Sequence, residues 1–149
     1  MIEAKREKNY RRVLRGTIPL QTYTNRIQLF DGLFTTGFRV VEFRIIPQTP
    51  TDSEEIMALL STENQGAVPS SFDFGNNEHV AYACWNVPNQ TLFSDWNLVI
   101  EGNMIVEDLW ISAYTTGDED SVNYYIVLDK YTFSDWNGAL TMVRNRSQT

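Results

Sequence analysis

His79 and Cys84 are the residues whose types come nearest to nucleophilic catalysis. A thiol is activated by an imidazole base that lies within hydrogen-bond distance. The surrounding sequence NEHVAYACW is typical of a strand, in which side chains five positions apart point to opposite faces. The spacing therefore argues against a Cys–His nucleophile, and we expect Cys84 to be a small buried hydrophobic residue.

Glu107 and Asp108 are adjacent carboxylates, and a pair of carboxylates is the machinery of glycoside hydrolysis. Neighbours in a strand point to opposite faces, so these two do not form one site by themselves. The sequence also contains no glycine-rich phosphate loop, no GxSxG elbow and no HExxH motif. We therefore predict no catalytic residue, no cofactor and no enzymatic activity, with a glycan-acting enzyme as a distant third possibility.

The segment TTGDEDS gathers hard oxygen ligands at a turn. Asp118 and Asp120 are the candidates for a calcium ion, although the spacing differs from the twelve-residue EF-hand loop. Acidic turn tips are more often solvated hairpin ends. One cysteine and one histidine exclude an intramolecular disulfide and a Cys/His zinc site within one chain. We therefore predict no metal site, with calcium as the minor alternative.

Charge is segregated along the chain. Residues 1–16 carry a net charge of +4 and the remainder −11, which together give the overall −7. The basic residues of this N-terminal arm are Lys5, Arg6, Lys8, Arg11, Arg12 and Arg15. Such an arm can neutralise the phosphates of a nucleic acid or dock on the acidic surface of another copy. It can also be the ordinary solvated end of a first strand.

The chain has four tryptophans, which suit either a sugar-binding surface or the packing of a core and interfaces. We favour packing. Two of them belong to the pentapeptide FSDWN, which occurs at residues 93–97 and again at 133–137. The flanking sequences differ, which argues against a duplicated module. We predict that Ser94 and Ser134 cap two chain reversals, anchored by Trp96 and Trp136 against the core.

We expect β-strands along most of the chain, because runs rich in aromatic and β-branched residues are separated by turn-forming residues. Two hairpins are predicted, one around the Asp-Gly pair at residues 31–32 and one joining 104–114 to 122–131 through TTGDEDS. Residues 53–62 and 134–143 fit a helix or a strand, with strand slightly favoured for the first.

Finer expectations concern two strands. The segment RVLRGTIPLQTY, which Pro19 interrupts, suits an edge or N-terminal strand. In the later segment, strict alternation places Val41, Phe43 and Ile45 on one face. Phe38, Val40, Glu42, Arg44 and Ile46 then share the other face.

A chain of 149 residues with 42% hydrophobic content suits one domain. We predict an all-β, single-domain antiparallel β-sandwich of about eight strands at residues 17–149, jelly-roll-like, preceded by the basic arm at 1–16. No apolar run reaches eighteen residues, so no membrane span is expected. The N-terminus is charged and no apolar segment follows it, so no secretory signal is expected either.

The basic arm, the acidic all-β body, VNYYIVLDKY at 122–131 and WNGALTMVRN at 136–145 together resemble small single-jelly-roll capsid proteins of non-enveloped viruses or tailless phages. The arm is shorter and poorer in arginine than many in that family. The resemblance implies a virion structural protein that self-assembles, contacts other virion proteins and directs its arm toward the genome or neighbouring subunits. The alternative is a ligand-binding β-sandwich, such as a fibre tip or a receptor- or carbohydrate-binding module.

Overall fold

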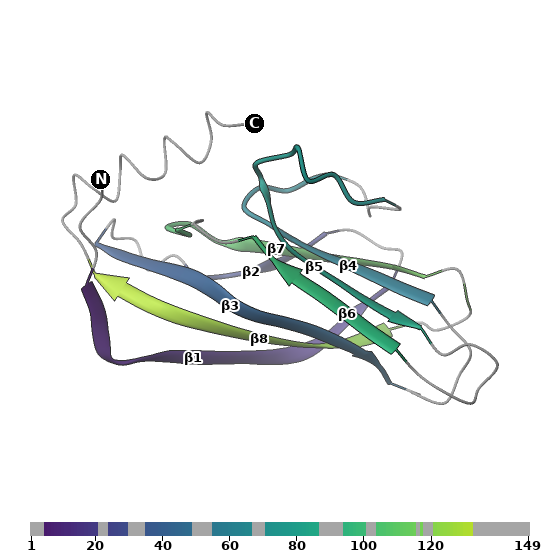
Figure 1. Ribbon diagram of the computed structural model, residues 1–149, viewed down its shortest axis with the longest axis horizontal. Helices are drawn as coiled ribbons and strands as arrows, with labels where there is room; N and C mark the ends of the chain where they lie inside the picture. The colour runs from purple at the N-terminus through teal and green to yellow at the C-terminus, as the bar shows by residue number, and fades with distance from the viewer. Residues whose placement is uncertain are drawn as a thin grey trace.

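The computed structural model describes residues 5–20, 24–29, 35–48, 55–66, 71–86, 94–100, 104–115, 117 and 121–132, with side chains from residue 10 onward. The eight strands in these residues are β1 (Lys5–Pro19), β2 (Asn25–Ile27), β3 (Thr36–Pro47), β4 (Glu55–Ser61), β5 (His79–Asn86), β6 (Ser94–Val99), β7 (Leu109–Thr115) and β8 (Ser121–Thr132). They form two antiparallel sheets with the orders β1-β8-β3 and β2-β7-β4-β5-β6. Figure 1 shows the two sheets as stacked layers. The predicted all-β sandwich is confirmed.

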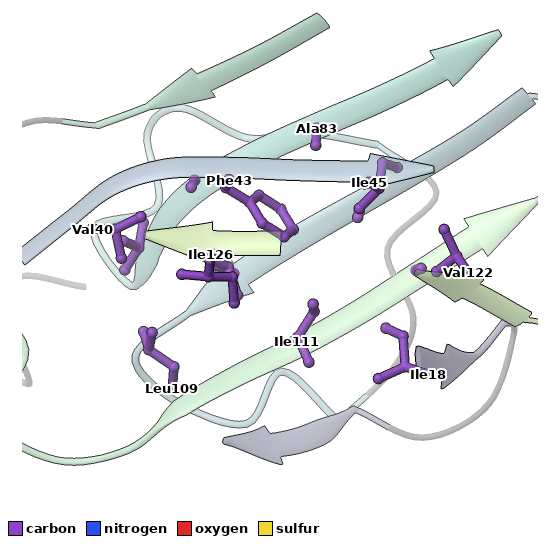
Figure 2. Packing of buried hydrophobic residues seen from close by; sticks show 14 of the residues in the cluster. Ile18, Val40, Phe43, Ile45, Ala83, Leu109, Ile111, Val122 and Ile126 are labelled. Atoms are coloured by element: carbon purple, nitrogen blue, oxygen red, sulfur yellow. The ribbon is translucent and has the colours of Figure 1, made fainter. Parts of the chain in front are cut away.

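The hydrophobic core lies between the two layers. On the five-stranded sheet, Ala113, Ala58 and Ala83 stand opposite one another in register, and all three are buried. This row of small side chains leaves room for larger ones from the three-stranded sheet, including Phe43 and Ile126. Figure 2 shows side chains from both sheets filling the space between them. Apolar burial of this kind is the main stabilising contribution to the fold.

Both predicted hairpins are wrong. β2 pairs with β7 in the larger sheet, whereas the following strand β3 pairs with β8 in the smaller one. In the same way, β7 and β8 belong to different sheets. Residues 31–32 lie outside the described part of the chain. Turn-forming residues indicate that the chain reverses, but they carry no information on whether it returns in the same sheet or crosses to the opposite layer.

The predicted faces of β3 need correction because the strand contains a β-bulge. The register with β8 shifts between Val40 and Glu42. Phe38 and Val40 are therefore buried on the same side as Phe43, while Val41 is exposed. One extra residue reverses the alternation of all that follows, and the sequence shows no sign of it.

Two further expectations concern single strands. Residues 53–62 do contain a strand, β4, whereas 134–143 lie outside the described residues. β1 lies at the edge of its sheet and ends at Pro19, as the position of that proline suggested. Within the described residues, no helix is long and apolar enough to cross a membrane.

Gly16 of β1 is a close-packing point. An added Cβ would lie 2.8 Å from the hydroxyl oxygen of Tyr124 and 3.0 Å from its Cζ atom. We expect Gly16→Val to displace this ring and to lower the free energy of unfolding by about 1–3 kcal/mol, measured by urea titration. The matched control is Arg15→Val, at the exposed neighbouring position, which should stay near wild type. An unchanged midpoint for Gly16→Val would show that the ring moves aside without cost.

Candidate functional site: two faces of opposite character

The sandwich separates the charges of the chain between its two layers. The three strands β1, β3 and β8 contain most of the basic residues, namely Lys5, Arg6, Lys8, Arg11, Arg12, Arg15, Arg39, Arg44 and Lys130. The same strands contain only Glu7, Glu42 and Asp129 as acidic residues. Between Arg44 and Lys130 the sequence has no lysine or arginine, and this stretch supplies four strands of the other sheet. The linear segregation of charge thus becomes a difference between two layers.

The outward side of the three-stranded sheet is called here the basic face. Its members alternate with the core residues of the same strands. They are Arg11, Val13, Arg15 and Thr17 of β1, Asn123, Tyr125, Val127 and Asp129 of β8, and Arg39, Val41, Glu42, Arg44 and Ile46 of β3. Sequence reasoning found only Arg11 and Arg15 among its arginines. Strict alternation places Arg44 on the face opposite Phe43, as observed, but it places Arg39 on the side of Phe43, because the bulge lies between these two arginines.

Two rows of arginine cross the basic face. In the first, Asp129 lies in register between Arg11 and Arg39. Its carboxylate is buried and accepts a hydrogen bond from Arg11 Nε at 3.1 Å, with Nη2 at 3.0 Å. The Arg39 guanidinium lies 5.3 Å from the ring centroid of Tyr131. This row is held by an ion pair and a cation–π contact.

The second row places Tyr125 in register between Arg15 and Arg44. Arg44 forms an ion pair with Glu42 and also reaches Asp95 of β6, with 3.7 Å between Nη1 and Oδ2. β6 therefore lies beside β3 as well as pairing with β5. The carboxylates of Glu42 and Asp95 offset the charge of Arg44. Arg15, on the edge strand β1, is the other cation of this row.

An apolar band separates the two rows. Val127 is buried at its centre, and Val13 of β1, in register with it, is 49% exposed. On the β3 side the bulge places Val41, 43% exposed, next to Glu42, which is the residue in register with Val127. Tyr125 and Ile46, each 41% exposed, extend the apolar surface past the second row. Contiguous apolar surface with arginine and tyrosine at its rim is typical of a surface that contacts another macromolecule.

The outward side of β5 and β6 has the opposite character and is called here the aromatic face. The Tyr82 ring lies 4.5 Å from Phe72 and 5.1 Å from Phe74, measured between centroids. Phe72 stacks on Trp96 at 6.2 Å. Phe74 is 62% exposed, Trp96 46% and Leu98 37%. The charged residues in the turn beside these rings, Asp73 and Glu78, are acidic.

A buried polar chain fixes this turn to β5. The Tyr82 hydroxyl donates to the backbone carbonyl of Asp73 at 2.9 Å and lies 2.9 Å from Nδ1 of His79. Burial, together with the nearby Asp73 carboxylate, raises the pKa of Tyr82 to about 12. The phenol therefore stays protonated at neutral pH and remains a donor. Burial lowers the pKa of His79, although Asp73 and Glu78 oppose the shift.

Acid should weaken the fold through His79. Its folded-state pKa lies below the ordinary value of 6.5, so the unfolded chain binds the proton first as the pH falls through that value. This contribution to stability is complete above about pH 6.5 and is lost below it. We expect the urea midpoint of wild type to fall more between about pH 7.5 and pH 5.5 than that of His79→Gln. Parallel pH profiles for the two proteins would contradict this role of His79.

The other chemically suggestive residues of the sequence do not converge on a catalytic site. Cys84 is half-buried on the outward side of β5, and burial raises the pKa of its thiol. His79 contacts Tyr82 instead. The Asp108 carboxylate binds Arg26 and the backbone N–H of Leu29, so it holds β2 in place, while Glu107 is only partly buried. Within the described residues no group of three His, Cys, Asp or Glu side chains is arranged for a metal.

The remaining predicted site residues are placed as follows. β1 contains the whole basic set, but the side chains of Lys5, Arg6 and Lys8 are not described. Ser94 is the first residue of β6 and pairs with Asn86. The expectation that Trp96 anchors a bend in the core is wrong, because this side chain lies on the outside. The second pentapeptide, with Ser134 and Trp136, and the calcium candidates Asp118 and Asp120 lie outside the described residues.

A cavity of about 560 Å³ opens where β3 meets β6. It is lined by Arg44, Ile45, Ile46, Trp85, Asp95, Asn123, Tyr124 and Tyr125. Aromatic rings together with a guanidinium, a carboxylate and an amide can bind a small amphipathic molecule or a sugar. Comparisons with protein-family models, curated proteins and solved structures found no match to this chain.

Proposed function

We propose that this protein is a capsid subunit, a virion structural protein whose β-sandwich self-assembles into a shell. The observation that carries the proposal is the nested order of strand pairs. β1 pairs with β8, β2 with β7 and β4 with β5, while β3 lies beside β6. Such a nested order is typical of an eight-stranded antiparallel ribbon folded back on itself, and it supports our proposal of a jelly roll. The departure from that pattern is β6, which lies beside β3 but is hydrogen-bonded to β5.

Jelly rolls occur in viral capsids and in lectins, so this architecture alone does not select a function. Two features of the surface favour assembly. Large apolar side chains are exposed on both outer faces of the sandwich, on β1 and β3 on one side and on β6 and the 71–78 turn on the other. The faces also differ in the sign of their charge. A subunit that contacts neighbours on two sides needs such surfaces, whereas a monomer gains nothing from them.

The basic β1 strand is directed, in this proposal, toward the genome or a neighbouring subunit. Deleting residues 1–4 and replacing Lys5, Arg6 and Lys8 by Ser would remove arm charges while leaving β1 paired with β8 from Arg11 onward. Loss of salt-sensitive binding to nucleic acid would assign the arm to the genome. Unchanged nucleic-acid binding with impaired assembly would assign it to subunit contacts.

Self-assembly is tested on the purified wild-type chain. We expect size-exclusion chromatography with light scattering to show large discrete oligomers or particles of about a megadalton or more, visible by electron microscopy. The control is the same protein at low concentration and high salt, where charged contacts weaken and smaller species should increase. A chain that stays monomeric at every concentration and salt would overturn the proposal.

A ligand-binding module is the second candidate, because the cavity beside β6 combines aromatic and polar side chains. In that function the chain is a monomer or small oligomer and binds a glycan there. Glycan-array binding that Asp95→Asn weakens, with no particle formed by wild type, would favour this candidate. Particle formation without glycan binding would exclude it.

A further inference from the structure

We propose that the subunits meet head to tail, with the basic face of one copy on the aromatic face of the next. This inference rests on the proposed self-assembly and goes beyond it by naming the two contacting surfaces. The basic face is the outward side of β1, β8 and β3, and the aromatic face is the outward side of β5 and β6 with the 71–78 turn. They lie on opposite layers of the sandwich (Figure 1).

The apolar parts of the two surfaces complement each other. The basic face offers an apolar band with exposed Val13 and Val41. The aromatic face offers Phe74, Trp96 and Leu98, which stand out from the sheet as exposed side chains. Large aromatic anchors that pack on an aliphatic surface and lose their water are the usual energetic centre of a protein interface.

The charges are complementary as well. Asp73 is exposed next to Phe74, and Glu78 lies five residues after Asp73 in the same turn. In the stretch that supplies β4 to β7 no lysine or arginine is present to neutralise them. Across the contact, the exposed Arg15 and Arg39 flank the apolar band. Opposite charges around an apolar centre favour correct orientation and faster association.

The same charges disfavour a two-fold symmetric contact. If two basic faces met, the arginine rows of one copy would lie on those of its partner. A contact between two different faces is heterologous, so each subunit keeps one free face after it has bound a neighbour. Repetition of such a contact produces a closed ring or an open helical filament, and a shell requires a further kind of contact between these rings or filaments.

Two double variants test the inference. Val13→Glu with Arg15→Glu alters the basic face, and Phe74→Ser with Trp96→Ser alters the aromatic face. All four positions are exposed, which leaves the core unchanged. Each variant alone should lose particles and elute as a monomer, with the subunit dissociation constant raised at least about tenfold. Gln28→Glu, at an exposed position near the far edge strand β2, is the matched control and should assemble like wild type.

Mixing the two variants is the decisive step, because each retains the face that the other lacks. We expect a 1:1 heterodimer by light scattering that does not grow further, since the remaining two faces are both altered. Absence of this heterodimer, with both variants folded by circular dichroism, would overturn the head-to-tail contact. If a double variant does not fold, the single variants Arg15→Glu and Phe74→Ser provide the same comparison.

The outcomes separate this inference from the proposed function. If the wild-type protein does not assemble, the proposed function as a capsid subunit is excluded. If both double variants form normal particles, the proposed self-assembly is retained, and the basic and aromatic faces are excluded as its contact surfaces. If Val13→Glu with Arg15→Glu assembles normally and loses only salt-sensitive nucleic-acid binding, the basic face contacts nucleic acid and the head-to-tail contact is excluded.

Discussion

Replacing Phe43 by Ala should lower the free energy of unfolding by about 3–5 kcal/mol, the range for removing a fully buried aromatic side chain. Phe43 has no exposed surface and lies in the core cluster between the sheets. The substitution leaves a cavity between the two sheets, and movement of the sheets toward each other can close this cavity only partly. The measurement is urea unfolding followed by tryptophan fluorescence.

Val41→Ala is the matched control, because Val41 is a near neighbour on the same strand with its side chain on the outside. Its expected cost is within about 0.5 kcal/mol. The pair also tests the bulge in β3. Strict alternation from Val41 to Phe43 would place both side chains in the core, and then both substitutions would be costly. A large loss for Val41→Ala in the monomer would contradict the observed register.

Replacing Asp108 by Ala should cost about 2–3 kcal/mol, because it leaves a partly buried backbone N–H without its acceptor and breaks an ion pair. The carboxylate accepts from Leu29 N–H at 2.8 Å and binds the Arg26 guanidinium. The Arg26 side chain is 54% exposed, so solvent screens part of the ion pair and the estimate lies at the lower end for buried pairs. Denaturant titration measures the loss.

The loss at Asp108 should be local to the β2 edge. Hydrogen exchange of the amides in β2 and at Leu29 should accelerate more than exchange in β8, since Asp108 fixes the short edge strand. Glu55→Ala, at an exposed end of β4, is the matched control and should change stability by less than about 0.5 kcal/mol. Equal losses for the two variants would show that the Asp108 contacts contribute nothing.

The two predicted hairpins show how far local signals reach. The runs on either side of TTGDEDS were recognised as strands, and the structure has them as β7 and β8. They were assigned to each other because hairpins are the commonest short connection. Each instead pairs, within its own sheet, with a strand distant in sequence: β7 with β2 and β8 with β1. Those pairings depend on which apolar faces fit together in the core, which no local window contains.

β4 gave an ambiguous signal for a related physical reason. It is a central strand between β5 and β7, and residues on both of its sides are buried. A strand covered on both faces loses the alternation of apolar and polar residues that identifies a strand at its surface. Its run of apolar residues is then compatible with a helix as well. Only the presence of two neighbouring strands decides between the alternatives.

The candidate site was predicted only in part. The arm residues Arg11 and Arg15 were found from the cluster of basic residues in the sequence. Arg39 and Arg44 were not connected to them, because they lie more than twenty residues away and join the same face only through pairing with β8. The aromatic face was missed because Trp96 was expected to be buried. A tryptophan in an apolar strand is equally compatible with a core and with an outer interface.

By itself the sequence determined the all-β class, the positions of most strands, and a separation of basic from acidic stretches, because composition and alternation are properties of short segments. The tertiary structure alone decided which strands share a sheet, which side of β3 faces the core, and how a linear separation of charge becomes two opposed faces. Strand pairing between distant segments is selected by the packing of one common core. That selection is a property of the whole chain.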